Sequence, residues 1–125
     1  MKTVFLLMLI FSMQLNAQTN NKNNFDVVRT YLLEIQGAVD YAPNSKKEKI
    51  DKLNKVIRQG TEQRRILKHA LKNKKNKQQQ HDILQHFNLI LQAIILLKTD
   101  INKNVSLSED LDYLNKNIPV LLKKL

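Results

Sequence analysis

Histidines are the first side chains in this sequence to consider for chemistry, because they could bind a metal or transfer a proton. The chain has three of them, His69, His81 and His86. His81 and His86 are five residues apart, which places them about 140° apart around a helix. A pair of metal ligands on one helix face needs a spacing of three or four, as Asp82 and His86 have, but two ligands do not make a site. The sequence therefore predicts no metal centre.

Serine, glycine and cysteine give no sign of catalysis either. Beyond residue 17 the serines are Ser45, Ser106 and Ser108, and none has the strand–turn–helix context of a nucleophilic serine. The two glycines, Gly37 and Gly60, cannot form a phosphate-binding or dinucleotide-binding loop. The absence of cysteine excludes disulfides, thiolate metal sites, a cysteine nucleophile and a lipid-modified cysteine. We expect no cofactor and no enzymatic activity. A hydrolase that uses paired carboxylates is the least favoured alternative.

The distribution of charge is the most informative feature. The net charge is +10, and nearly all of it lies between residues 45 and 77, where thirteen lysines and arginines face three acidic residues. On a helix, many of these side chains project opposite the apolar stripe, and the rest follow in a polar connector without acidic neighbours. The candidate binding residues for an anionic partner are Lys47, Lys55, Arg58, Arg65, Lys72, Lys74, Lys75 and Lys77.

Two interpretations of this basic face remain open. It is either a solvated surface that keeps the protein soluble, or a docking surface for an anionic partner. That partner would be another protein or an anionic component of the cell envelope, such as a lipid or polysaccharide. Nucleic acid is disfavoured, because the face has no interleaved aromatic residues for base stacking and no helix-turn-helix or zinc-finger pattern.

The elements that must position this face are helices. Glycine and proline number only two each, too few for a strand-rich fold with frequent turns. Apolar residues recur at positions 83, 87, 90, 94, 97 and 101, which is helical spacing with a wide apolar face. We expect this helix to be the most buried of four. The fold class is therefore all-α, a small up-down four-helix bundle. The expected helices span residues 25–40, 46–74, 82–102 and 107–125.

Helix boundaries and irregularities follow from local signals. Ser45 and Ser106 each precede an acidic residue by three positions, the pattern of a capping box. The apolar stripe of the second helix rotates by about 80° after Gly60, at about 100° per residue. We therefore predict one long helix that is kinked near Gly60, with a break recapped by Thr61 as the alternative. Pro119 should kink or restart the fourth helix.

The first residues have the layout of a secretory signal. Lys2 precedes an apolar run from Val4 to Phe11, and Ala17 is a small residue ahead of a polar stretch. An uncleaved anchor is the alternative, but the run is shorter than the ~20 residues that a membrane span needs. We predict a signal peptide at 1–17, a disordered leader at 18–24, a helical-bundle domain at 25–125 and no transmembrane span in the mature chain. The protein would be secreted or periplasmic.

These features together indicate an exported, non-enzymatic helical-bundle protein that binds another macromolecule through a basic face. The alternative is direct binding of an anionic polymer. In size, charge and helix content the chain resembles the small, basic, all-helical chaperones of the bacterial periplasm, although it lacks their Leu-Thr-x-x-Gln signature.

Overall fold

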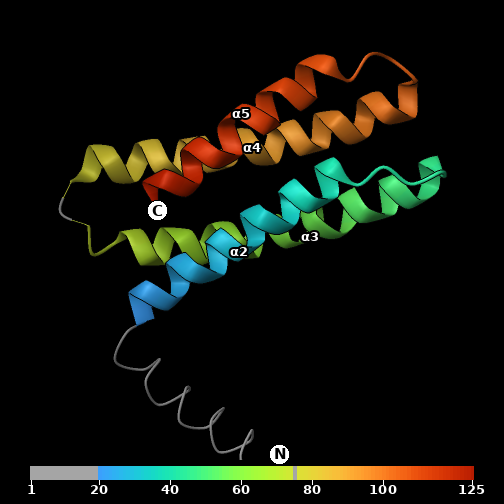
Figure 1. Ribbon diagram of the computed structural model, residues 1–125. Helices are drawn as coiled ribbons and strands as arrows, with labels where there is room; N and C mark the ends of the chain where they lie inside the picture. The colour runs from blue at the N-terminus through green and yellow to red at the C-terminus, as the bar shows by residue number, and fades with distance from the viewer. Residues whose placement is uncertain (1–19, 75) are drawn as a thin grey trace, which may run out of the picture.

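A computed structural model describes residues 20–74 and 76–125, and every regular element within them is a helix. Within the described residues, the all-α class and the expected number of helices are therefore confirmed (Figure 1). Residues 1–19, which include the expected signal peptide, lie outside the described residues. The helices are α2 (Asn20–Asp40), α3 (Lys46–Leu71), α4 (Lys77–Lys103) and α5 (Ser108–Lys124).

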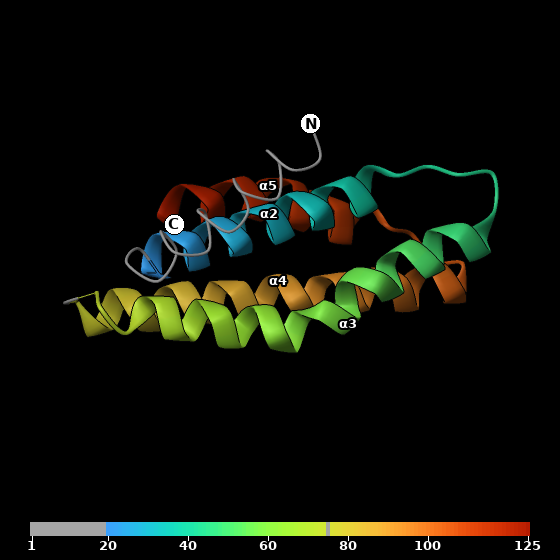
Figure 2. The ribbon, with the colours of Figure 1, turned by 90° about the horizontal axis from the view of Figure 1, so that it is seen from below.

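The four helices form a bundle in which chain neighbours are also spatial neighbours. Each of α2, α3 and α4 packs against the helix that follows it, and α5 closes the ring against α2. In Figure 2, α2 and α5 form one layer and α3 and α4 form the other. The short links make successive helices antiparallel, as in other up-down bundles. In the described part of the chain, no helix is long and apolar enough to cross a bilayer.

Apolar side chains from all four helices fill the core. Tyr31 and Phe87 are among its largest members, and their rings lie 6.1 Å apart. The Tyr31 hydroxyl donates a hydrogen bond to the Val56 carbonyl oxygen, so the polar end of this buried side chain is satisfied. No polar or charged residue among those described is buried. The domain is therefore held together by apolar packing, as its lack of cysteine requires.

The expectation that the third predicted helix is the most buried of the four is wrong, because α2, α3 and α4 each contain six buried residues among those described. This helix, α4, occupies one corner of the bundle, and only one side of it faces the core. Leu89, Ile95 and Leu96 on its flanks are 44%, 47% and 54% exposed. Because its apolar band is wider than the surface that two neighbouring helices cover, part of that band is left at the surface.

Of the two capping serines predicted from the sequence, Ser45 caps its helix and Ser106 does not. The Ser45 hydroxyl accepts a hydrogen bond from the Glu48 amide at 3.4 Å, as predicted. At α5 the Ser106 prediction is wrong: its hydroxyl accepts from the Ser108 amide and pairs with the Ser108 hydroxyl at 3.1 Å, so it does not reach the third amide along. The helix continues through Pro119 without a restart.

Two helices begin five residues earlier than predicted. The first includes residues 20–24, which were expected to belong to an unstructured leader; no proline or glycine in this polar segment opposes helix formation. The helix that follows the polar connector begins at Lys77, because the Asn76 side chain caps it by accepting from the Gln79 amide at 3.1 Å. The connector between α3 and α4 spans residues 72–76 and is only two residues shorter than expected, because α3 also ends earlier than predicted, at Leu71 and not at residue 74.

Helix α3 is continuous through Gly60, so the predicted break at Thr61 is wrong and the long helix is confirmed. Gly60 is buried against α4. A Cβ atom built on Gly60 would lie 3.1 and 3.2 Å from the two terminal carbons of Leu91 and 3.4 Å from the Tyr31 hydroxyl. The missing side chain thus lets α3 approach α4 closely at this point. The predicted kink is a separate matter and stays a prediction.

Candidate functional site

Five of the eight predicted site residues belong to α3 or its C-cap and lie on its outer side. Lys47, Arg58, Arg65 and Lys72 follow one another at intervals of eleven, seven and seven residues, which keeps them on one face of the helix. Lys55 flanks this row, and all five side chains are exposed. The row is exposed because the buried side chains of α3 lie on the opposite side, where the helix meets its neighbours. We call these residues, with Lys74 and Lys77, the basic surface.

The charge of this surface is only partly neutralised. Arg65 donates two hydrogen bonds to the Glu62 carboxylate, from Nε at 2.9 Å and from Nη2 at 2.5 Å. The hydrogen bond from Arg65 lowers the pKa of Glu62, so the pair is fully charged at neutral pH. In the described part of the chain the other members of the surface make no ion pair. Their positive charge is therefore open to solvent or to a partner.

Two of the three predicted residues in the connector can be placed. Lys77 is exposed in the first turn of α4. Lys74 is half-buried, with its Nζ 5.4 Å from the centre of the Phe25 ring, and its carbonyl accepts a hydrogen bond from the Gln80 side chain. Lys75 lies outside the described residues. Lys74 therefore helps to hold the connector against α2 while keeping its charge near the surface.

Two lysines at the same end of the bundle were not among the predicted site residues. Lys123 and Lys124 are exposed in the last turn of α5, and antiparallel packing brings this turn beside the connector between α3 and α4 (Figure 1). The Nζ of Lys124 lies 3.1 Å from Nδ1 of His86, whose other ring nitrogen lies 3.1 Å from the Asn117 side chain. Burial, and then the charge of Lys124, lower the pKa of His86. The up-down topology itself could have signalled this extension of the basic surface.

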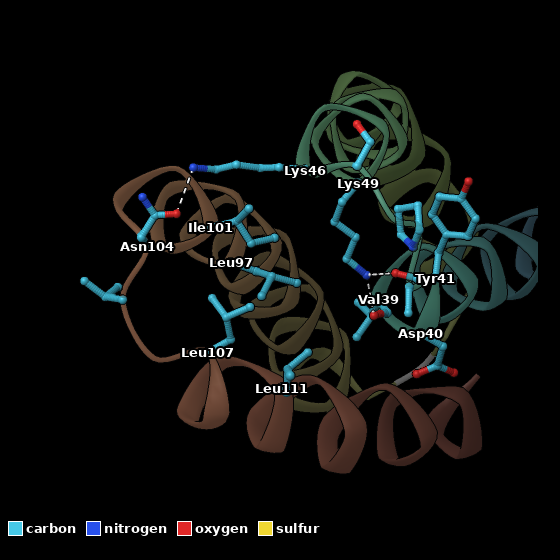
Figure 3. Close-up of a pocket in the computed structure, with 14 residues that line it drawn as sticks. Val39, Asp40, Tyr41, Lys46, Lys49, Leu97, Ile101, Asn104, Leu107 and Leu111 are labelled. Carbon is cyan, nitrogen blue, oxygen red and sulfur yellow. Dashed lines mark hydrogen bonds between the residues drawn. The ribbon is translucent and has the colours of Figure 1, made fainter.

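Not every basic residue of α3 faces outward. The Lys49 ammonium donates hydrogen bonds to the carbonyl oxygens of Ala38 at 2.7 Å, Val39 at 2.6 Å and Tyr41 (Figure 3). These are carbonyls at the end of α2, which has no basic residue in its own last turn. Burial lowers the pKa of Lys49. Its role is therefore to cap the neighbouring helix, and it is not available to a partner.

One pair of carboxylates does converge. Asp110, in the first turn of α5, interacts with Asp100 of α4; burial, followed by the hydrogen bond and the charge of Asp100, raises its pKa to about 6. Asp110, but not Asp100, borders a shallow hollow of about 230 Å³ between the two helices, where Gln92 and Tyr113 are the other polar side chains. Among the described residues, no group of three or more side chains suited to metal binding occurs. This pair is the place where the carboxylate-hydrolase alternative would have to operate.

The fold and surface define a small all-helical bundle with a concentrated positive charge on one helix and one end. The chain matches no known protein family, no curated protein and no solved structure.

Proposed function

We propose that this is an exported, non-enzymatic protein that binds an anionic macromolecule, most simply an acidic protein, through its basic surface. The observation that carries the proposal is the segregation of charge: nearly all of the net charge of +10 belongs to α3 and the connector after it. A surface that only provided solubility would mix both signs around the bundle. A one-sided field instead attracts and orients a partner of opposite charge.

The shape of the basic surface suits an extended or helical acidic segment. Residues seven apart on a helix are about 10 Å apart along its axis, at ~1.5 Å per residue. Arg58, Arg65 and Lys72 thus present cationic groups at regular steps on a rigid rod. A bend of α3 at Gly60 would set the angle between the two halves of the row. Ile95 lies one turn after Leu91, on the flank of α4 that meets α3, and its exposed side chain offers apolar surface for a lasting contact.

Charge-reversal variants test the surface directly. Lys55→Glu with Arg58→Glu should abolish capture of partners from a cell-envelope extract. The matched control is Lys103→Glu with Lys116→Glu, which changes the net charge equally at exposed positions of α4 and α5. The control should retain capture, as measured by quantitative mass spectrometry after cross-linking at low salt. Equal loss in both variants would show that net charge, and not this surface, attracts the captured proteins.

Salt separates the acidic-protein partner from the alternative of an anionic polymer. Binding to a polymer should weaken linearly in log K against log salt, with a steep slope set by the number of cations engaged. An acidic protein that also uses apolar contacts should be much less sensitive to salt. Export is tested separately, by mass spectrometry of the N-terminus in cell fractions: a chain that begins at Gln18 outside the cytoplasm is expected. A cytoplasmic chain that retains residues 1–17 would overturn the proposed location.

A further inference from the structure

A cavity of about 720 Å³ lies at the end of the bundle opposite Lys123 and Lys124, where the α2–α3 link faces the α4–α5 link (Figure 3). The side chains of Leu97, Ile101, Leu107 and Leu111, together with Val39, give it largely apolar walls. A volume of this size falls within the ~300–1,000 Å³ that is usual for small-molecule sites. The interpretation of the basic surface does not involve this cavity.

The residue in the α2–α3 link best able to fill the cavity is held at its edge. The Tyr41 hydroxyl donates a hydrogen bond to Glu48 at 3.3 Å, and the Lys52 ammonium lies 5.2 Å from the centre of the Tyr41 ring. Both contacts draw the ring toward the outer side of α3, and Figure 3 shows it directed away from Leu97 and Ile101. Ile101, Leu107 and Leu111 are half-buried and therefore remain partly accessible from solvent, whereas Leu97 and Val39 are buried.

One cationic group stands at the mouth of this cavity. The Lys46 ammonium reaches across to α4, 2.9 Å from the Asn104 side-chain oxygen and 3.5 Å from the Asn102 carbonyl oxygen. Both acceptors are neutral, and Lys46 makes no ion pair within the described part of the chain. The acidic residue of the lining, Asp40, lies at the opposite edge beside Lys49 (Figure 3). The mouth thus combines an apolar interior with an uncompensated positive charge at its Lys46 side.

We propose that this cavity binds a single-chain aliphatic carboxylate, with the alkyl chain against Ile101, Leu107 and Leu111 and the carboxylate at the Lys46 ammonium. The apolar walls favour a hydrocarbon chain. The carboxylate can replace the neutral acceptors of Lys46 with a charge-assisted hydrogen bond. Lys49 strengthens the positive field from within the lining, although its hydrogen bonds to the end of α2 occupy its donors. This inference is independent of the basic surface and of any macromolecular partner.

Isothermal titration calorimetry with decanoate, dodecanoate and tetradecanoate, each below its micelle concentration, tests the chain contact. We expect about fourfold tighter binding per added methylene, which is ~0.8 kcal/mol of buried CH₂ at ~1.4 kcal/mol per tenfold change. Dodecanol, which lacks the charge, should bind more weakly than dodecanoate. Binding of dodecanoate that is absent, or that does not depend on chain length, would overturn the proposal.

Lys46→Gln tests the head group, with Lys47→Gln as its control. Lys47 is the next residue and carries the same charge, but it is exposed and does not line the cavity. Lys46→Gln should weaken dodecanoate about tenfold or more and dodecanol less than twofold, since a hydrogen bond to a charged group is lost. Lys47→Gln should change neither affinity. Equal losses of dodecanoate binding in the two variants would indicate a general attraction to a basic protein and refute the site.

A filling variant and a mass measurement complete the test. Val105 lines the cavity and is 49% exposed, so Val105→Trp should fold, as checked by circular dichroism, and should abolish binding of dodecanoate. Retained affinity in this variant would place the ligand elsewhere. Sedimentation of the protein without amphiphile should show a monomer, because no second copy of the chain is expected to cover the cavity. A dimer that Val105→Trp disrupts would mean that a second copy of the chain, and not an amphiphile, covers the cavity.

Discussion

Replacing Gly60 by alanine separates two explanations of this residue, close packing and backbone bending. Alanine is favoured over glycine inside a helix by about 1 kcal/mol. The new Cβ atom would lie 3.1 and 3.2 Å from the terminal carbons of Leu91, closer than the 3.4 Å at which ordinary contact begins. Overpacking of a core costs about 1–3 kcal/mol. Leu91 is only half-buried, so its side chain can give way and the cost falls at the low end of that range.

The free energy of unfolding of Gly60→Ala should therefore lie within about 1 kcal/mol of the natural protein, because the helix-propensity gain offsets the contact. The contact disappears in a Leu91→Ala background, where Gly60→Ala should stabilise the bundle by about 1 kcal/mol. The coupling between the two sites should thus be about 1 kcal/mol, which a double-mutant cycle can measure. Urea unfolding followed by circular dichroism supplies all four free energies.

The same cycle tests the predicted kink. If α3 must bend at Gly60, alanine should destabilise the bundle by the same amount whether or not Leu91 is present. That result would refute the close-packing explanation. Stabilisation by the same amount in both backgrounds would also refute it, because it would show that the Leu91 contact costs nothing.

Three further predictions concern the core, the carboxylate pair and the cap on α2. Ile94 is fully buried, so Ile94→Ala should cost about 2–5 kcal/mol in urea unfolding, whereas the exposed control Lys116→Ala should change stability by no more than about 0.5 kcal/mol. The pKa of Asp110 rises from 3.8 to about 6 on folding, so its contribution to stability is fully present below pH 3.8 and is lost as the pH rises through 6. The free energy of unfolding of the natural protein should therefore fall by about 1 kcal/mol between pH 4 and 7 because of Asp110, after allowance for solvent screening. Asp110→Asn should not show this fall, and an unchanged pH profile in the variant would contradict the raised pKa. Lys49→Met should cost about 1–3 kcal/mol, because three carbonyls at the end of α2 lose their donor. Hydrogen exchange should then become faster in the last turn of α2 but not in α5.

Local sequence signals predicted the helices well where the interactions are themselves local. Ser45 caps α3 because its hydroxyl meets an amide only three residues away. Ser106 has the same spacing but fails, because a second hydroxyl, that of Ser108, competes for it. The early start of α4 depends on the side chain of Asn76, which caps the helix. Asn76 lies in a polar segment without apolar residues, so no apolar periodicity indicated a helix there. The prediction of a helix cap therefore requires knowledge of the competing hydrogen-bond partners as well as of the spacing.

Features that depend on packing between distant residues were not predictable in this way. The sequence predicted a kink of the helix near Gly60, but the close approach of Gly60 to Leu91 on the next helix could not be predicted from it. The cavity beside the α2–α3 and α4–α5 links brings together Lys46 of α3 and Leu107 of the α4–α5 link, which no motif connects. Likewise, the position of Lys124 next to the basic surface becomes evident only when α5 is placed antiparallel to α4. The basic charge was visible in the sequence because most of it lies on one helix and on the connector that directly follows it.

The neighbour-to-neighbour packing of the bundle has a consequence for how the chain reaches its native state. Apart from the seam between α2 and α5, the main interfaces join helices that are adjacent in sequence. Helical proteins with such low contact order fold on the order of microseconds to milliseconds. Two hairpins, α2–α3 and α4–α5, can form without each other, and the seam between α2 and α5 can close only after both exist. Substitutions in that seam should therefore accelerate unfolding and leave the rate of folding almost unchanged.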